Sequence, residues 1–233
     1  NVTAFVVSET NTNFSAVDGM LCSADGSTIV KYPAGANIDY IELPETITSI
    51  ADYAFENAVN LEGILASNDE TAFAVNAIVN PSNYLVLYGN SESTTKNFAS
   101  FNGIEFIALD ADYAFGDVNA DGAVDAADAS SILTVYALTS TGHRCKYIDA
   151  QKIAADIDLD GNINSSDTSK VLAYYAYAST TDEAVVSLAD FCGVDDPTFE
   201  VEIIEPETEA PTEEITIPSE EATEAATEEA AEA

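Results

Sequence analysis

The sequence predicts a multi-domain chain in which a short solenoid of α/β repeats is followed by an all-α module and a disordered acidic tail. Three observations lead to this prediction. Strand-like segments recur at nearly regular intervals, two windows of equal length share one pattern of oxygen-bearing side chains, and the end of the chain, 195–233, contains no Lys or Arg. The expected boundaries are 1–110 for the repeats, 111–194 for the all-α module and 195–233 for the tail.

The composition excludes several classes of function. The 233 residues include 42 Asp and Glu against 6 Lys and Arg, which gives a net charge of −36. A chain this acidic repels phosphates, so we expect no binding to nucleic acid or to anionic lipid. No apolar run is long enough to cross a bilayer. The three cysteines, Cys22, Cys145 and Cys192, are far apart and indicate neither a disulfide framework nor a metal site.

The tail is predicted from its composition. Residues 195–233 contain 15 acids, and most of the other residues there are Thr, Ala and Pro. Such a segment has too little apolar surface to offset the entropy of ordering it, and its charges repel one another. We expect an extended linker or tail. Without it, the remaining 27 acids and 6 bases still give a net charge of −21.

The repeats are marked by four strand-like segments, at 40–43, 63–66, 84–87 and 105–108. Taking one apolar marker from each, Ile41, Ile64, Val86 and Phe106, the intervals in the numbering are 23, 22 and 20. One strand and one apolar flank are too little to fold alone, so such units are expected to stack on one another. The period falls in the range of leucine-rich repeats.

The amino-acid sequence of this region resembles the bacterial BspA-like leucine-rich repeat family. The resemblance is carried by Phe14–Gly35, Ile41–Ile64 and Leu85–Leu109, whereas residues 67–81 depart from the pattern and predict an irregular repeat. The last of the three resembles the closing unit of that family, a strand, a short helix ended by Gly103 and a final strand. The resemblance implies a surface or secreted protein whose repeats bind an unknown protein or polysaccharide, and it assigns no binding residue.

The middle of the chain contains two windows, 117–128 and 156–167, that predict calcium loops. In both, oxygen-bearing side chains occupy positions 1, 3, 5, 9 and 12, Gly stands at position 6 and an aliphatic residue at position 8. Ca²⁺ takes six to eight oxygen ligands, and crowded carboxylates are costly unless a cation lies among them. We therefore expect two Ca²⁺ ions, with a backbone carbonyl as the ligand at position 7. The expected ligands are Asp117, Asn119, Asp121, Ala123, Asp125 and Asp128 in the first loop, and Asp156, Asp158, Asp160, Asn162, Asn164 and Asp167 in the second.

The duplication continues beyond the loops. With an offset of 39 in the numbering, Ile132, Leu133 and Tyr136 fall on Val171, Leu172 and Tyr175. Apolar residues at i, i+1 and i+4 predict an amphipathic helix after each loop. Strand-like residues precede the first loop and leave no room for an entering helix, so the module is EF-hand-like without being an ordinary helix–loop–helix pair. We also expect Val124 and Ile163, at position 8, to join the loops in a short strand contact.

A calcium loop followed by a helix, twice, with Asp at position 12, resembles the dockerin family of cellulosome-type assemblies over residues 113–192. The resemblance implies calcium-dependent binding to a cohesin module of a scaffolding protein, through loop positions 10 and 11 and the helices. Leu133 and Leu172 could instead belong to the core of the module. The residues implied in partner binding are Ala126, Ala127, Leu133, Tyr136 and Leu138 in one half, and Ser165, Ser166, Leu172, Tyr174 and Tyr177 in the other.

Two further expectations concern the surroundings of the loops. Arg144, Lys146 and Lys152 lie between the halves, and we expect them to offset the charge of the carboxylate loops rather than to face an acidic partner. After the second helix, the apolar residues of 185–191 are expected to pack against Tyr113 and Phe115. Because positions 10 and 11 differ between the halves, we expect one preferred docking orientation.

The sequence predicts a non-catalytic chain. His143 is the only histidine and no nucleophile pattern surrounds it, and no phosphate-binding loop or zinc-binding helix is present. The expected function is that of an extracellular adaptor, secreted or in a cell-surface complex of an anaerobic bacterium. The alternative is the C-terminal anchoring part of a larger secreted polysaccharide-degrading enzyme, because the chain begins within a repeat. A calcium-dependent structural protein without a cohesin partner is the third possibility.

Overall fold

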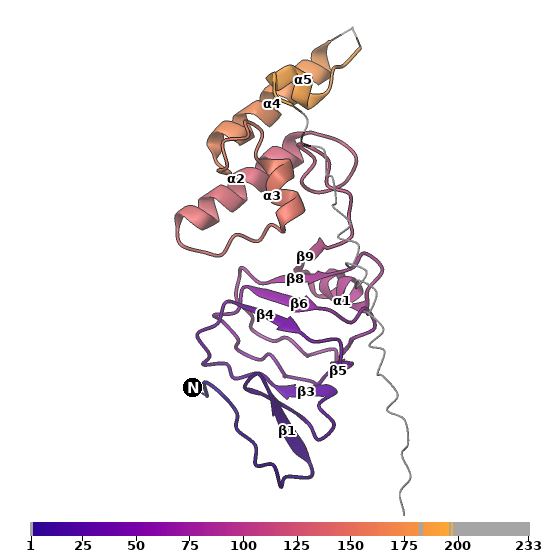
Figure 1. Cartoon of the computed structure of the whole chain (residues 1–233), viewed down its shortest axis with the longest axis vertical. Coiled ribbons are helices and arrows are strands. Elements are labelled where there is room, and N and C mark those ends of the chain that lie inside the picture. The colour runs from indigo at the N-terminus through magenta and orange to yellow at the C-terminus, as the bar shows by residue number, and fades with distance from the viewer. Residues whose placement is uncertain (1, 182–183, 196, 198–233) are drawn as a thin grey trace, which may run out of the picture. The chain divides into compact units, whose positions relative to one another are not determined.

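The computed structural model describes residues 2–181, 184–195 and 197 (Figure 1). The predicted tail, 195–233, lies outside the described residues except for Asp195 and Pro197. Among the described residues, no helix combines the length and the apolar character needed to cross a membrane. The strands are β1 (Phe14–Val17), β2 (Met20–Ser23), β3 (Thr28–Lys31), β4 (Tyr40–Leu43), β5 (Ser49–Ile50), β6 (Gly63–Ala66), β7 (Ala72–Phe73), β8 (Val86–Gly89) and β9 (Glu105–Ala108). The helices are α1 (Thr94–Asn102), α2 (Ala126–Ser140), α3 (Asp149–Ala155), α4 (Ser165–Thr180) and α5 (Leu188–Cys192).

The repeats form two sheets. One has the order β1-β2-β3-β5-β7 and begins with antiparallel pairs, and the other is the parallel sheet β4-β6-β8-β9 (Figure 1). The turn between β1 and β2 consists of Asp18 and Gly19, with φ angles of 48° and 76°, as tight hairpins require. From β3 onward, successive coils add parallel strands to the two sheets.

The register of the parallel sheet corrects one sequence prediction. Ile64 pairs with Leu87, and Leu87 pairs with Phe106, so the third marker is Leu87 and the strand spans 86–89 rather than 84–87. Side chains alternate between the faces of a strand, so a shift of one residue exchanges the faces. Leu87 therefore packs in the interior between the sheets, and Val86 lies on the opposite face.

The interior of the repeats is apolar and continuous from coil to coil. Ile47, Phe55 and Leu61 are each at most 1% exposed. Hydrogen bonds join neighbouring coils, as from Thr71 Oγ1 to the Ile47 carbonyl at 3.0 Å. Residues 67–81, expected to be irregular, still supply β7, which pairs with β5.

The last repeat contains the one helix that the sequence predicted there. Helix α1 begins after Ser93, whose Oγ accepts the Lys96 N–H at 3.3 Å, and ends at Gly103 with φ 65°. A left-handed residue is the usual end of a helix, and glycine adopts it without a steric cost.

Residues after β9 form only helices among the described elements. Their interior contains Ile132, Val171 and Leu188 together with Tyr113 and Phe115. Leu188 of α5 thus joins the apolar cluster that contains Tyr113 and Phe115, as expected for 185–191. Gly116 leaves room for Leu188, because a Cβ there would lie 2.3 Å from Leu188 Cδ2.

The outer face of the parallel sheet carries the side chains of Tyr40 and Tyr88, which meet edge to face with ring centroids 5.9 Å apart. They close over Gly63, where an added Cβ would lie 2.7 Å from Tyr40 Cδ2. The Arg144 guanidinium, from the segment between α2 and α3, lies 4.2 Å from the Tyr40 ring centroid and donates to Tyr88 Oη at 3.0 Å. Burial raises the pKa of Tyr88 to about 12, so its phenol stays protonated and donates to the Lys146 carbonyl at 2.8 Å.

These contacts correct the expectation for the bases. The Arg144 N–H donates to Glu62 Oε2 at 3.0 Å, and Lys146 forms an ion pair with Glu105 on β9. Both bases therefore contact the repeats rather than the carboxylate loops, and Ile148 packs on the same sheet face. All of these residues lie within one compact unit, Asn1–Thr198.

We expect Phe55→Ala to lower the free energy of unfolding of the repeats by about 3–5 kcal/mol, because it leaves a cavity in the core. The Phe55 ring is buried and stacks on the Tyr32 ring, with ring centroids 5.3 Å apart. Hydrogen exchange at the β6 amides measures this loss. The matched control is Phe101→Ala, since Phe101 is 81% exposed on α1. Equal effects of the two substitutions would contradict the assigned interior.

We expect Arg144→Ala to accelerate hydrogen exchange of the backbone at 143–148 by roughly tenfold, because it removes a cation–π contact and a hydrogen bond. Lys152→Ala is the control, since the ion pair of Lys152 with Asp149 at 2.8 Å lies within α3. Unchanged exchange in Arg144→Ala would show that this side chain does not hold the segment against the sheet.

Candidate metal centre

The two carboxylate loops follow the same backbone path. Ala120 and Leu159, at position 4, are left-handed with φ of 55° and 57°, and Gly122 and Gly161, at position 6, have φ of 87° and 83°. A left-handed conformation costs a non-glycine residue about 1–2 kcal/mol. The same strain at the same position shows that the repeated sequence is a repeated structure.

The acid at position 1 closes each loop on itself. Asp117 accepts the N–H groups of Asp121 at 3.2 Å and Gly122 at 2.8 Å. Asp156 accepts the equivalent N–H groups of Asp160 and Gly161 at 3.1 and 2.8 Å. The glycine at position 6 lets the chain turn back over this carboxylate.

The acid at position 12 joins the start of each loop to the start of the following helix. Asp128 accepts from the Val118 N–H at 3.0 Å with Oδ1 and from the Asp125 N–H at 2.9 Å with Oδ2. Asp167 does the same with Ile157 and Asn164, each at 2.8 Å. Positions 9 and 12 are therefore the N-cap and third residues of α2 and α4 in a capping box.

Burial gives these two acids an unusual electrostatic setting. Asp128 and Asp167 are both 0% exposed. Loss of solvent raises the pKa of each carboxyl above its ordinary value, and the nearby charges of Asp117 and Asp158 raise it further. A cation beside these carboxylates would favour their ionised form.

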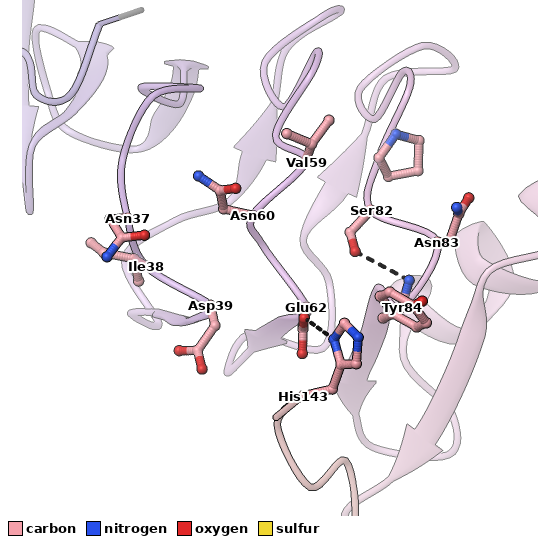
Figure 2. Close-up of a pocket in the computed structure, with 11 residues that line it drawn as sticks. Asn37, Ile38, Asp39, Val59, Asn60, Glu62, Ser82, Asn83, Tyr84 and His143 are labelled. Atoms are coloured by element: carbon pink, nitrogen blue, oxygen red, sulfur yellow. Dashed lines mark hydrogen bonds and ion pairs between the residues drawn. The ribbon is translucent and has the colours of Figure 1, made fainter. Parts of the chain in front are cut away.

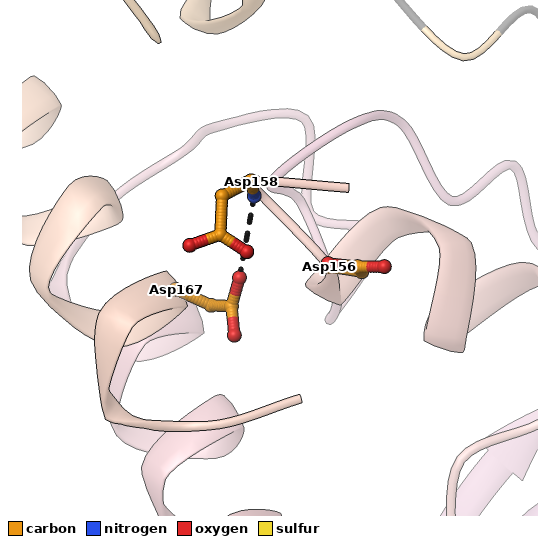
Figure 3. Close-up of side chains that lie close together, drawn as sticks. All are labelled: Asp156, Asp158 and Asp167. Carbon is orange, nitrogen blue, oxygen red and sulfur yellow. Dashed lines mark hydrogen bonds between the residues drawn. The ribbon is translucent and has the colours of Figure 1, made fainter. Parts of the chain in front are cut away.

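The second loop brings three carboxylates together. One oxygen each of Asp156, Asp158 and Asp167 lie within 4.8 Å of one another (Figure 3). Asp158 Oδ1 is buried and accepts no hydrogen bond from the described residues. An unpaired buried acceptor among like charges is costly, and a hard divalent cation would satisfy it. The donor set therefore fits Ca²⁺.

The first loop differs at position 3. Asn119 stands where the second loop has Asp158, and its Nδ2 donates to Asp121 Oδ2 at 2.9 Å. An amide oxygen is a calcium ligand as well, but it brings no charge. Among the described residues, Asp156, Asp158 and Asp167 are the only three acids that converge in this way.

The other predicted ligands face the loop itself. Asp121 and Asp160, at position 5, accept the N–H groups of Ala123 and Asn162 at 3.0 and 2.7 Å. Asp125 and Asn164, at position 9, accept N–H groups of the first helical turn. Each of these side chains keeps further acceptor capacity, so these bonds are compatible with a ligand role. The expected strand contact between Val124 and Ile163 is absent from the described elements, and both residues pack on the helical core instead.

The helices carry two equivalent exposed pairs. Leu133 and Tyr136 on α2 are 46% and 38% exposed, and their counterparts Leu172 and Tyr175 on α4 are 44% and 42% exposed. Leu133 and Leu172 are thus surface residues rather than core. The offset of 39 in the sequence places Tyr175 on Tyr136, and the structure exposes both rings.

The remaining residues of the predicted partner surface are less uniform. Four of them sit at loop positions 10 and 11, and all four, Ala126, Ala127, Ser165 and Ser166, are exposed. Leu138 on α2 is half-buried. Tyr174 and Tyr177 lie against Phe191 of α5, with ring centroids at 5.7 and 5.2 Å.

Comparison with known families identifies this arrangement. The model of the dockerin type I domain matches residues 115–174. The chain contains a dockerin domain. Dockerin type I domains bind calcium, in agreement with the donor set of the loops, and the family implies a cohesin partner.

Two solved structures align with part of the chain. A leucine-rich repeat protein from Eubacterium ventriosum aligns at 21% identity and a TM-score of 0.34, and the pneumococcal vaccine antigen PcpA at 24% identity and a TM-score of 0.30. Each alignment covers 38% of this chain and 24% of the other, so the alignment spans about a quarter of their length. No curated protein matches the chain.

We expect Asp156→Ala to abolish calcium binding by the second loop, because it removes one of three converging carboxylates and two bonds that close the loop. Isothermal titration with Ca²⁺ should show one ion fewer per chain. The control is Asp112→Ala, an acid outside both loops. An unchanged stoichiometry in Asp156→Ala would contradict this site.

Proposed function

We propose that this chain is a non-catalytic extracellular adaptor. Its dockerin domain binds a scaffoldin cohesin in a calcium-dependent way and anchors the leucine-rich repeats, which serve as a recognition module, in a cellulosome-like complex. The observation that carries the proposal is the exposed pair of Leu and Tyr that follows each carboxylate loop. Large apolar side chains at equivalent places in both halves are suited to burial by a partner protein.

Calcium dependence is supported by how the loops are built. The N-cap and third residue of α2 and of α4 are loop positions 9 and 12, so a cation held by the loop also fixes the start of the helix. Two ions, one in each EF-hand-like loop, would balance half of the eight carboxylate charges. Because the docking residues lie on these helices, the binding energy of Ca²⁺ becomes part of the stability of the docking surface.

A single preferred orientation is supported by differences near the loops. Ser165 and Ser166 offer hydroxyls where Ala126 and Ala127 offer methyl groups, and only hydroxyls can hydrogen-bond a partner. Leu138, near the end of α2, borders a crevice that Glu62 and Tyr84 of the repeats also line. These observations favour docking through α4, with Ser165, Leu172 and Tyr175 in contact with the cohesin.

The test uses the whole chain and a purified scaffoldin cohesin in surface plasmon resonance. Binding is expected with Ca²⁺ and lost in excess chelator. Leu172→Ala with Tyr175→Ala should weaken binding at least tenfold, because such anchors contribute about 1–2 kcal/mol each or more. Leu133→Ala with Tyr136→Ala is the matched control for the other helix.

The outcomes of these binding measurements separate the orientation of docking from its calcium dependence. Equal losses in the two double variants would contradict a single orientation while leaving the docking function in place. Binding that persists in excess chelator would contradict the calcium-dependent mechanism. Phe101→Ala, an exposed aromatic on the repeats, serves as the control for a general loss of apolar surface.

A further inference from the structure

A groove of about 640 Å³ runs along the amino-terminal ends of β4, β6 and β8 (Figure 2). Three consecutive coils of the repeats line it, and His143 from the dockerin domain lies at one end. Its polar lining consists mainly of amides and carboxylates, contributed by Asn37, Asp39, Asn60, Glu62 and Asn83.

The amides repeat with the coils. Asn37, Asn60 and Asn83 recur at a constant interval of 23 in the numbering, and each stands three places before a member of one pairing row, Tyr40, Gly63 and Val86. Neighbouring strands are about 4.8 Å apart, so equivalent groups follow one another at about that step. Figure 2 shows one amide on each of the three coils.

Most of these polar groups are not used by the fold. Among the described residues, the side chains of Asn37, Asp39 and Asn83 form no hydrogen bond, and all three are exposed. Asn60 donates once, to the Ala36 carbonyl at 3.1 Å, and keeps its oxygen and one N–H. Tyr84, 43% exposed, adds an aromatic ring at the third coil.

The neighbouring sheet face cannot serve the same purpose. Arg144 and Ile148 cover its outer side chains, and Val86 and Tyr88 are only 1% and 2% exposed there. The groove at the strand ends is therefore an accessible polar surface of the parallel sheet next to a covered one.

From this lining we propose that the groove binds a neutral polysaccharide chain. Amides offer donors and acceptors and carboxylates accept from hydroxyls, which suits a ligand rich in hydroxyl groups. The only base among the described lining residues is His143, whose Nδ1 lies 2.7 Å from Glu62 Oε1, so an anionic ligand finds no unpaired cation there. The inference rests on the recognition role proposed for the repeats and is independent of cohesin docking.

The spacing favours a glycan over a peptide. The groove presents an equivalent amide on each successive coil, so it suits a ligand whose units also recur at a constant step along its length. An extended peptide advances by about 3.2–3.4 Å per residue, which is shorter than the step between coils. A pyranose ring is longer than one peptide residue, so linked sugar rings advance by a longer step that is closer to the step between coils. Tyr84 lies against the His143 ring, with centroids 3.9 Å apart, and its exposed part supplies an apolar surface for one ring of the chain.

The test titrates the whole chain, with Ca²⁺ present, with cellohexaose, xylohexaose and mannohexaose, and with hexagalacturonate as an anionic comparison. At least one neutral oligosaccharide should bind and shift the side-chain NH₂ resonances of Asn37, Asn60 and Asn83 in nitrogen–proton spectra. Asn37→Ala with Asn83→Ala should weaken that binding at least tenfold. Neither side chain forms a hydrogen bond in the described part of the chain, so the fold is expected to stay intact.

The matched control is Asn13→Ala, an exposed amide outside the groove. No binding of any neutral oligosaccharide, a preference for hexagalacturonate, or unchanged affinity in the double variant would each overturn the proposal. Cohesin binding measured on the same samples separates the two functions. If the wild-type chain binds a glycan but no cohesin, the docking role alone is contradicted. If it binds cohesin but no glycan, the groove proposal alone is contradicted.

Discussion

The dockerin domain depends on two buried carboxylates, Asp128 and Asp167. Each accepts backbone N–H groups from both ends of its own loop, so one side chain joins the start of the loop to the start of the helix. Burying a charge is costly unless it is hydrogen-bonded and neutralised by a partner. The hydrogen bonds are internal to the protein, whereas the opposite charge has to come from the cation. Loop and helix are thus coupled through a single residue in each half.

The second constraint is the small space above Gly63. Only glycine lets Tyr40 and Tyr88 approach each other there, and the two rings form the platform on which Arg144 rests. The segment 143–148 thereby belongs to both modules, since Arg144 contacts the repeats and Tyr147 is buried in the core of the dockerin domain. Repeats and dockerin share a packed and hydrogen-bonded contact, which is more than a linker alone would provide.

Much of this could be predicted from the sequence, because the deciding signals are local. Oxygen-bearing residues at fixed positions predict the loops, and the offset of 39 predicts the equivalent helices. The errors concern contacts between residues far apart in sequence. Val86 and Leu87 are both apolar, so only the pairing with β6 shows which of them faces the interior. Likewise, nothing near Arg144 in the sequence indicates Tyr40, in a different module, as its partner.

The two modules differ in what they need in order to fold. The interior of the repeats contains no residue of the carboxylate loops and is closed by apolar side chains and hydrogen bonds between coils. A stacked solenoid of this kind is stabilised by contacts between neighbouring units. The dockerin loops, in contrast, bring like charges together, which opposes folding until a cation binds. The repeats can therefore keep Tyr40, Gly63 and Tyr88 in place in either state. A cation bound in the loops would act on the dockerin side of the contact, where it would stabilise the start of α2 and of α4.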